Sequence, residues 1–346
     1  MPLFVIFVFG AVILGAGVML SPAFPTRQPR IGLASAFALA IIVGGTIFYA
    51  MLFGWDILVI DYLLFALVVG IFLGGTLSIG QARAEARGEV LEDQDQGWPG
   101  PQDLAMIGVF ALVFILPVLI LPVPLGSQGQ LEGYLALAVR EGQTLDTLAP
   151  FLPDVTYVHA PGFSALIAYL SQQLGQWIHI VVFVVGGVLG LVCVWLAYDL
   201  GSEQQDKRLG RATALTILLS PGVFGAYLDG YSTGLMGLVF TMAFVIFALR
   251  YIRSGYPVDV FLAGLMLGAV IVSDLHLLIV ALLGYIPWLA TMWLGEPKPD
   301  PQRWLVLALG VPLVAILATS PWLLNTDFGI LFDAPNFERD AVANLT

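Results

Sequence analysis

The chain has 346 residues, of which 59% are hydrophobic and only 11% are charged. Too few polar side chains are present to cover a water-soluble domain of this length, so the composition excludes a soluble globular protein and indicates a membrane protein. The formal net charge of −11 argues against a nucleic-acid partner, because nucleic acids are bound by basic surfaces. The single cysteine, Cys193, lies inside an apolar run, so the chain can form no internal disulfide.

Long apolar stretches follow one another along the chain, each near the length that crosses a hydrocarbon core of about 30 Å. They are continuous and do not alternate with polar residues, which favours helices over a transmembrane barrel. The sequence therefore predicts an all-α polytopic membrane protein with about ten transmembrane helices. The expected spans are residues 3–20, 31–53, 57–79, 104–121, 177–200, 212–228, 233–252, 258–272, 277–294 and 304–323.

Polar segments divide these spans into regions. Residues 1–79 are expected to form three leading transmembrane helices, and residues 80–103 a solvated cytoplasmic linker of mixed charge. Residues 104–323 form the main transmembrane module, which carries a long outer loop at residues 122–176. Residues 324–346 form a polar outer-face tail that stops without a closing element, so we expect the chain to continue beyond it.

The basic residues predict the orientation, because Lys and Arg gather in cytoplasmic loops. Eleven of the 13 Lys and Arg residues fall on one side of the membrane if residues 163–174 do not cross it. Only Arg140 and Arg339 then lie opposite. The N-terminus and the loop 122–176 are therefore expected outside the cytoplasm, in a plasma (inner) membrane protein whose first partners are membrane lipids.

Two short amphipathic helices are predicted to lie in the membrane interface within the loop 122–176. In residues 163–174 the apolar residues recur at helical spacing, but about twelve residues are too few to cross the bilayer. In residues 130–141 one stripe is apolar and Glu132 lies off it. The stripe consists of Leu131, Tyr134, Leu135 and Ala138.

Acidic residues beside the outer ends of spans are the first candidate functional residues. Glu132 could take a proton from an acceptor or hold a cation against a phosphate, as transfer from a lipid-linked donor requires. The alternative is a solvated residue on an exposed face. Asp229, in AYLDGYST, is either a second site residue or a helix cap for the following span, together with Ser232 and Thr233.

Further candidates lie in other outer turns. Asp274 and His276 form an Asp-x-His pair that could share a metal ion with another carboxylate, or could simply cap a turn. His159 could bind a phosphate or lie at headgroup level. Asp61 lies near the outer start of its span, where a snorkelling or paired carboxylate is expected.

The segments QLEGYLALAVREGQTL, YVHAPGF and SPGVFGAYLDGYS, in this order around the outer loop, resemble the GT-C superfamily of membrane glycosyltransferases. These enzymes use polyprenyl-phosphate sugars and include protein O-mannosyltransferases and aminoarabinose transferases. The resemblance runs from the fourth span onward and implies a GT-C-like fold there. It also implies a glycosyltransferase that moves a sugar from a polyprenyl-phosphate donor to an acceptor at the extracytoplasmic face.

The resemblance also implies site residues. The family places a catalytic Asp a few residues before the loop Tyr, where this chain has Gln130, and Glu132 is the nearest acid. The implied catalytic residues are Glu132 and Asp229, and a divalent cation stays open as a cofactor. The substrate-binding residues would be Tyr134, Arg140, His159, Asp274 and His276.

The missing Asp leaves an alternative from another class. The chain would then be a catalytically silent GT-C-like subunit that helps to assemble a larger membrane complex. Helices within residues 1–79, which are outside the resemblance, would dock the other membrane subunits.

Overall fold

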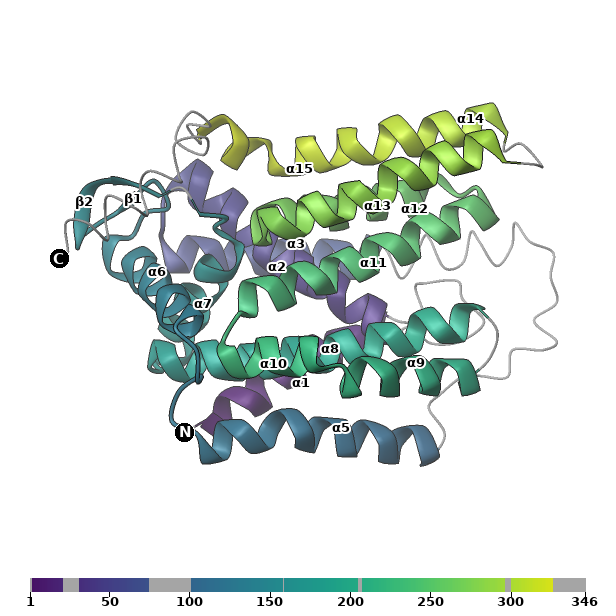
Figure 1. Cartoon of the computed structure of the whole chain (residues 1–346). Coiled ribbons are helices and arrows are strands. Elements are labelled where there is room, and N and C mark those ends of the chain that lie inside the picture. Colours follow the sequence, from purple (N-terminus) through teal and green to yellow (C-terminus); the bar gives the residue numbers. More distant parts are fainter. Residues whose placement is uncertain are drawn as a thin grey trace.

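A computed structural model of the chain describes residues 2–20, 31–74, 101–157, 159–204, 207–295 and 300–325. Nearly all of the predicted linker 80–103 and of the tail 324–346 lies outside these residues. Within them, the predicted all-α character is confirmed (Figure 1). The long helices are α1 (Pro2–Leu20), α2 (Ile31–Phe53), α3 (Ile57–Gly74), α5 (Pro101–Ile120), α8 (Ile178–Gln204), α11 (Ser232–Ser254), α12 (Pro257–Ser273) and α13 (Leu275–Leu294).

The last predicted span is one helical rod built from three pieces. These are α14 (Pro301–Leu305), a π-helical segment (Val306–Gly310) and α15 (Val311–Asn325). Among the described residues, five helices are long and apolar enough to cross a membrane: α2, α8, α11, α13 and this last rod. Shorter apolar helices stand at Pro2–Ile13, Ile57–Val69, Gly108–Ile120 and Pro257–Ser273. The fold is therefore that of a multi-pass helical membrane protein.

The predicted span 212–228 differs from the structure, because it is two helices and not one. The two helices are α9 (Lys207–Leu219) and α10 (Pro221–Asp229), which are bent by 46° at Ser220. The Ser220 side chain accepts a hydrogen bond from the backbone of Gly222 and so caps α10. Pro221 has no N–H to continue the ladder of α9. Taken together, the pair would make a sixth candidate span.

Helix α8 is the centre of the bundle. It is apolar around its whole circumference, and almost all of it is buried against α1, α2, α5, α9 and α11. Near one end, the buried Asp199 accepts a hydrogen bond of 2.9 Å from the backbone N–H of Leu33, in the first turn of α2. A carboxylate at this position satisfies one of the unpaired N–H groups with which a helix begins. The leading helices are thus tied into the bundle.

Two short helices and a hairpin gather at one end of the bundle (Figure 1). They are α6 (Gln128–Gly142), α7 (Gly162–Leu174) and the antiparallel strands β1 (Thr147–Leu148) and β2 (Leu152–Thr156). We call this the α6–α7 end. The hairpin was not predicted from the sequence, because its two strands are too short to show a clear alternation. Helix α7 stays at this end and does not run along the bundle, as expected for residues 163–174.

The apolar side of α7 meets protein, whereas the sequence analysis expected it to rest on lipid. Phe163, Leu166 and Ile167 are fully buried, and α7 packs against α2, α6 and α8. On its polar side, the Tyr169 hydroxyl donates a hydrogen bond of 2.6 Å to Asp61 of α3, which also accepts a hydrogen bond from Gln173. Asp61 therefore holds α7 in place.

Candidate functional site

Glu132 lies on the buried face of α6, so the alternative interpretation, a solvated residue on an exposed face, was wrong. Only 4% of Glu132 is exposed, and it shares this face with Gly129, Leu135 and Val139. Gly129 packs directly on Gly230, since a Cβ at Gly230 would lie 2.7 Å from the Cα of Gly129. This close approach brings the next turn of α6 against the beginning of α11. The buried face of α6 is therefore set by contact with protein, and its apolar stripe did not reveal this.

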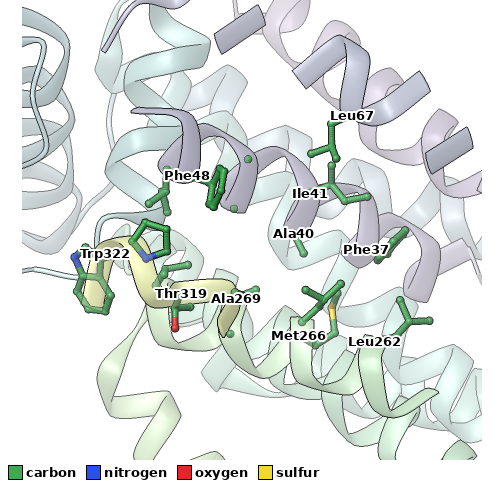
Figure 2. Close-up of a pocket in the computed structure, with 18 of the residues that line it drawn as sticks. Phe37, Ala40, Ile41, Phe48, Leu67, Leu262, Met266, Ala269, Thr319 and Trp322 are labelled. Atoms are coloured by element: carbon green, nitrogen blue, oxygen red, sulfur yellow. The ribbon is translucent and has the colours of Figure 1, made fainter. Parts of the chain in front are cut away.

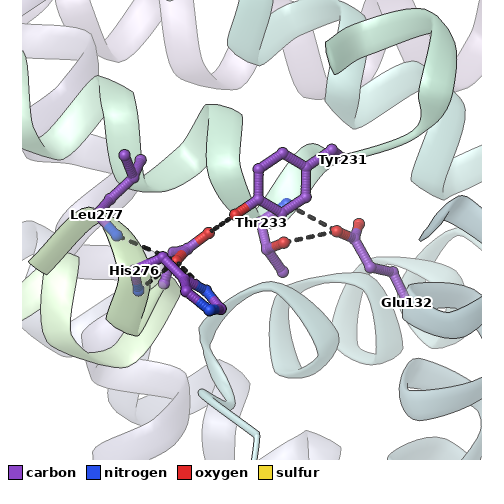
Figure 3. A network of polar contacts seen from close by, with 6 residues as sticks. Glu132, Tyr231, Thr233, His276 and Leu277 are labelled. Carbon is purple, nitrogen blue, oxygen red and sulfur yellow. Dashed lines mark hydrogen bonds and ion pairs between the residues drawn. The ribbon is translucent and has the colours of Figure 1, made fainter. Parts of the chain in front are cut away.

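Glu132 binds the N-terminus of α11 from outside that helix. One of its oxygens, Oε1, accepts hydrogen bonds from the backbone N–H of Thr233 at 3.0 Å and from the Thr233 hydroxyl at 2.6 Å (Figure 3). The residue just before α11, Tyr231, makes no side-chain cap. Glu132 thus caps α11 as a neighbouring side chain would, although it lies on another helix. The helix dipole favours a negative charge there.

The second carboxylate oxygen of Glu132, Oε2, is buried and has no hydrogen-bond partner among the described residues. Burial raises the pKa of Glu132 from 4.5 to about 8; the hydrogen bonds from Thr233 and Ser232 oppose the rise, and the charge of Asp274 adds to it. A carboxyl group with this pKa exchanges its proton near neutral pH. This is the property that a general base or acid requires.

Asp274 is the second buried acid at this end. Its Oδ1 accepts hydrogen bonds from the backbone N–H groups of His276 at 2.7 Å and Leu277 at 3.2 Å, and so caps α13. Its Oδ2 accepts a hydrogen bond from the Tyr231 hydroxyl. The imidazole Nδ1 of His276 lies 3.4 Å from Oδ1, on a side chain that is 91% exposed. The expected capped turn is confirmed, and it also binds Tyr231.

These contacts form one group of side chains, which we call the acidic network: Glu132, Tyr231, Thr233, Asp274 and His276 (Figure 3). It runs from the enclosed Glu132, through the turn before α11, to the exposed His276. Burial, followed by the hydrogen bond to Asp274, raises the pKa of the Tyr231 hydroxyl, which therefore keeps its proton and acts as a donor. The network thus joins α6, α11 and α13.

The other predicted site residues do not join the acidic network. Asp229 is exposed at the end of α10, although its backbone packs on Gly126 near the start of α6. Arg140 lies 2.7 Å from Glu141 in an ion pair. Tyr134 packs its ring 5.7 Å from that of Phe151, and the exposed His159 packs against Tyr157.

Three contributing residues were missed by sequence reasoning or given another role. Thr233 was treated as a cap for its own helix, and only the fold shows that it donates to Glu132. Tyr231 was treated as a flanking aromatic residue. Tyr157 is buried near Glu132 and bonds to Ser164 of α7; burial raises the pKa of its hydroxyl, and the charge of Glu132 adds to the rise. One signal was available in the sequence. Ser232-Thr233-Gly234 begins an apolar run, which marks a helix N-terminus, and such an end is stabilised by an acidic group.

In the part of the chain that the structure describes, no group of three or more His, Cys, Asp and Glu side chains is arranged to hold a metal ion. Asp274 and His276 supply two such groups, as the sequence analysis anticipated, and no third ligand from the described residues joins them. Comparison of the chain with protein-family models, curated proteins and solved structures gives no match.

Proposed function

We propose that the chain crosses the membrane ten times and that its α6–α7 end faces away from the cytoplasm. The four shorter apolar helices, the bent α9–α10 pair and the five long spans together make ten crossings. Lys207 and Arg208 at the start of α9, and Arg253 at the end of α11, belong to the helix ends opposite to the α6–α7 end. This charge distribution supports the orientation.

We further propose that the chain is a GT-C-like glycosyltransferase that uses a polyprenyl-phosphate sugar at this face. The observation that supports this most is Glu132: an acid beside the membrane surface, kept from water, with one oxygen held by Thr233 and the other free to accept a proton. The resemblance of the loop segments to the superfamily gives the substrate class. The buried setting gives Glu132 a pKa of about 8, which suits a general base.

In the proposed reaction, an acceptor hydroxyl oxygen forms a bond to the anomeric carbon of the sugar. The bond between that carbon and the lipid phosphate oxygen breaks, and the phosphate leaves with the electron pair. Glu132 takes the proton of the hydroxyl. Substrate access requires α6 and α11 to separate enough to admit the hydroxyl, because Glu132 is enclosed in the present arrangement.

The remaining predicted site residues are candidate contacts for the substrate in this proposal. His276, exposed at one end of the network, and His159, exposed at the same end of the bundle, are the candidate contacts for the phosphate. Arg140 would first have to leave its ion pair with Glu141. Asp229 and Tyr134 stay candidate substrate contacts outside the network.

The test is transfer from a synthetic polyprenyl-phosphate sugar to hydroxyl acceptors by the purified protein in lipid nanodiscs. Glu132→Gln keeps an oxygen that can accept from Thr233 but cannot take a proton, so we expect transfer to fall by about 10²–10⁴-fold. The matched control is Asp154→Asn, which converts an exposed carboxylate of β2 at the same end of the bundle to its amide and should transfer normally. Full activity in Glu132→Gln would show that Glu132 is not the general base.

A specific observation favours a second function, that of a catalytically silent assembly subunit. The acid nearest to the expected catalytic position is engaged in holding α11 and is 4% exposed, as a purely structural residue would be. The outward side of α3, with Tyr62 and Phe65 exposed, would then contact other membrane subunits. This function would be supported over the enzyme by two results. Other membrane subunits should co-purify with the wild-type protein and be lost in Phe65→Arg, and Glu132→Gln should still assemble with them.

A further inference from the structure

Helix α7 connects the leading helices to the acidic network. Its polar side chains Tyr169, Gln172 and Gln173 form hydrogen bonds with the α2–α3 region. Its other end, at Gly162, packs beside the turn that carries Asp274. The helix has 13 residues, which is about 20 Å at 1.5 Å per residue. It therefore joins two parts of the α6–α7 end that are far apart in the sequence.

The turn between α2 and α3 has a fixed shape. Gly54 has a φ of 82°, which glycine adopts without strain. The Asp56 side chain accepts a hydrogen bond of 2.9 Å from the backbone N–H of Leu58 and so caps α3. Trp55 is only 6% exposed, and its indole Nε1 donates a hydrogen bond of 3.3 Å to Oε1 of Gln172. The turn thus holds a donor in place for α7.

Asp61, near the start of α3, binds α7 with both oxygens of its carboxylate. Its Oδ1 accepts a hydrogen bond of 2.6 Å from the Tyr169 hydroxyl, and its Oδ2 accepts one from the side-chain amide of Gln173. Burial, followed by the hydrogen bond to Asp61, raises the pKa of the Tyr169 hydroxyl, which therefore keeps its proton and stays a donor. Hydrogen bonds to an ionised acceptor are stronger than neutral ones, so Asp61 ties α3 firmly to α7.

An apolar groove lies between the leading helices and α12. Figure 2 shows Ile41 and Phe48 of α2 facing Met266 and Ala269 of α12 across it. Direct side-chain packing between α2 and α12 is interrupted along this groove, whereas α7 contacts both helices at the α6–α7 end. Helix α7 is therefore the element through which the leading helices meet the surroundings of the site.

The first residue of α7 fixes one neighbour of Glu132. A Cβ at Gly162 would lie 2.5 Å from the carbonyl oxygen of Val272 and 3.1 Å from the side chain of Met236, so α7 begins in close contact with α12 and α11. Val272 is in the last turn of α12, and Asp274 follows two residues later. The charge of Asp274 acts on Glu132. A shift of α7 would thus move a charged neighbour of Glu132.

Tyr157 makes a second connection between α7 and Glu132. Ser164 of α7 donates its hydroxyl to the Pro161 carbonyl at 3.1 Å, so Tyr157 is the donor in the bond between the Tyr157 and Ser164 hydroxyls. Tyr157 is 3% exposed and lies within range of the charge of Glu132. The titratable side chains whose charges interact with Glu132 are thus Tyr157, Tyr231 and Asp274.

From these contacts we propose that Asp61 is a positioning residue for Glu132 and that it acts through α7. Protein interiors are close-packed, so a displaced helix displaces the groups that pack on it. The leading helices then have a role inside the site, although the resemblance to glycosyltransferases begins only at the fourth span. A role of Asp61 in sugar transfer rests on the proposed function, whereas the placement of Glu132 can be measured without transfer.

Two variants loosen α7 and two serve as controls. Asp61→Ala removes the acceptor for Tyr169 and Gln173, and Tyr169→Phe removes one hydroxyl while it keeps the charge of Asp61. Asp61→Asn removes the charge but keeps an oxygen for Tyr169, and its NH2 group can donate to the turned amide of Gln173. Asp56→Ala removes a carboxylate of the same region that bonds to the backbone of α3.

The protonation of Glu132 is followed by infrared spectroscopy of the full-length protein in nanodiscs, from pH 6 to 10. The band of the protonated carboxyl group is assigned by its loss in Glu132→Gln, and its midpoint in the wild type is expected at about 8. Looser packing of α7 admits water, which favours the charged carboxylate. The midpoint should therefore fall by about one pH unit in Asp61→Ala and by less in Tyr169→Phe. Asp61→Asn and Asp56→Ala should keep the wild-type midpoint.

Three results would overturn the role of Asp61. The first is an unchanged midpoint in both Asp61→Ala and Tyr169→Phe. The second is an equal fall in Asp56→Ala, because general loosening of the α2–α3 region would then explain the change. The third is an equal fall in Asp61→Asn, because the loss of charge alone would then explain it.

The kcat of sugar transfer is measured separately. We expect kcat to fall by about 10²-fold in Asp61→Ala, as for a small misplacement of a catalytic group, with little change in KM and with recovery in Asp61→Asn. A lower midpoint in Asp61→Ala, when the wild type transfers no sugar, would keep the positioning role and reject the enzyme. A normal kcat with an unchanged midpoint in Asp61→Ala would keep the enzyme and reject the positioning role. The two proposals can thus fail independently.

Discussion

Thr233 donates both its backbone N–H and its hydroxyl to the same oxygen of Glu132, a residue 101 positions earlier in the chain. The N-terminus of α11 is therefore capped by another helix. Because the bond joins two elements, weakening it affects the packing of α6 as well as the first turn of α11. Each consequence of this arrangement can be measured.

Thr233→Val removes the hydroxyl at nearly constant shape while it keeps the backbone donor. We expect the free energy of unfolding to fall by about 1–3 kcal/mol, because a hydrogen bond to a buried carboxyl group is lost. Thermal unfolding in detergent would record this as a lower Tm. Thr216→Val is the control, since the Thr216 hydroxyl bonds only to Ala212 within its own helix, on an exposed face; an equal fall in both variants would refute the special role of Thr233.

Stability should decrease as pH rises through the pKa of Glu132. The folded protein holds this proton up to a pKa of about 8, whereas the unfolded chain releases it near 4.5. The contribution of the neutral carboxyl group is fully present below pH 4.5 and is lost as the pH approaches and passes 8. The expected loss is on the order of a few kcal/mol, and Glu132→Gln should flatten the dependence of Tm on pH. A Tm profile that is identical in wild type and Glu132→Gln between pH 5 and 9 would contradict this.

Transfer activity should show the opposite pH dependence. A general base acts only when it is deprotonated, so kcat/KM should rise with pH and level off above about 8. The measurement is the initial rate of sugar transfer in buffers from pH 6 to 9. A rate that falls over this interval would mean that the protonated form of Glu132 is the active one.

Asp274 should tolerate Asn better than Ala. Asn keeps one oxygen that can cap α13, and its NH2 group can donate to the Tyr231 hydroxyl in place of the second carboxylate oxygen, whereas Ala loses both contacts. We expect Asp274→Ala to lower the free energy of unfolding by at least about 1 kcal/mol, the usual cost of a lost cap, and Asp274→Asn to lower it less. Circular dichroism melts of the two variants would decide, and equal melts would show that the cap is not the important contact.

Asp61 should control the attachment of α7. Asp61→Ala removes the acceptor for Tyr169 and Gln173, so α7 should exchange its amide hydrogens faster. Hydrogen exchange followed by mass spectrometry would compare α7 with α11, which Asp61 does not contact in these bonds. Unchanged protection of α7 would show that its buried apolar face alone holds it.

The proposed orientation predicts which residues are open to impermeant thiol reagents in intact cells. Cys193 is buried, so neither the wild type nor a Cys193→Ala background should react with the reagent. Asp154→Cys, in β2, should be labelled from outside, and Arg208→Cys, in the first turn of α9, should be labelled only after permeabilisation. The reverse pattern would invert the topology, and labelling of both from outside would refute it.

The sequence by itself determined the helices. In a membrane, an uninterrupted apolar run must pair its backbone N–H and C=O groups within itself, which a helix does. The apolar run from Ile31 to Phe53 therefore predicted both ends of α2 correctly. The loop helix α7 was also predictable, because its length is too short to cross a bilayer. The break at Ser220 was visible as Ser-Pro-Gly, yet its effect of splitting a span was not.

The partners of polar residues were decided only by the tertiary structure. On α6, periodicity placed Glu132 off the apolar stripe, but Gly129 meets Gly230 so closely that the face bearing Glu132 turns inward. A residue's exposure depends on which neighbour covers it, and that neighbour comes from a distant part of the chain. The sequence could therefore name Glu132, Asp274 and His276 as candidates, whereas the fold alone joined them through Thr233 and Tyr231 and left Asp229 outside.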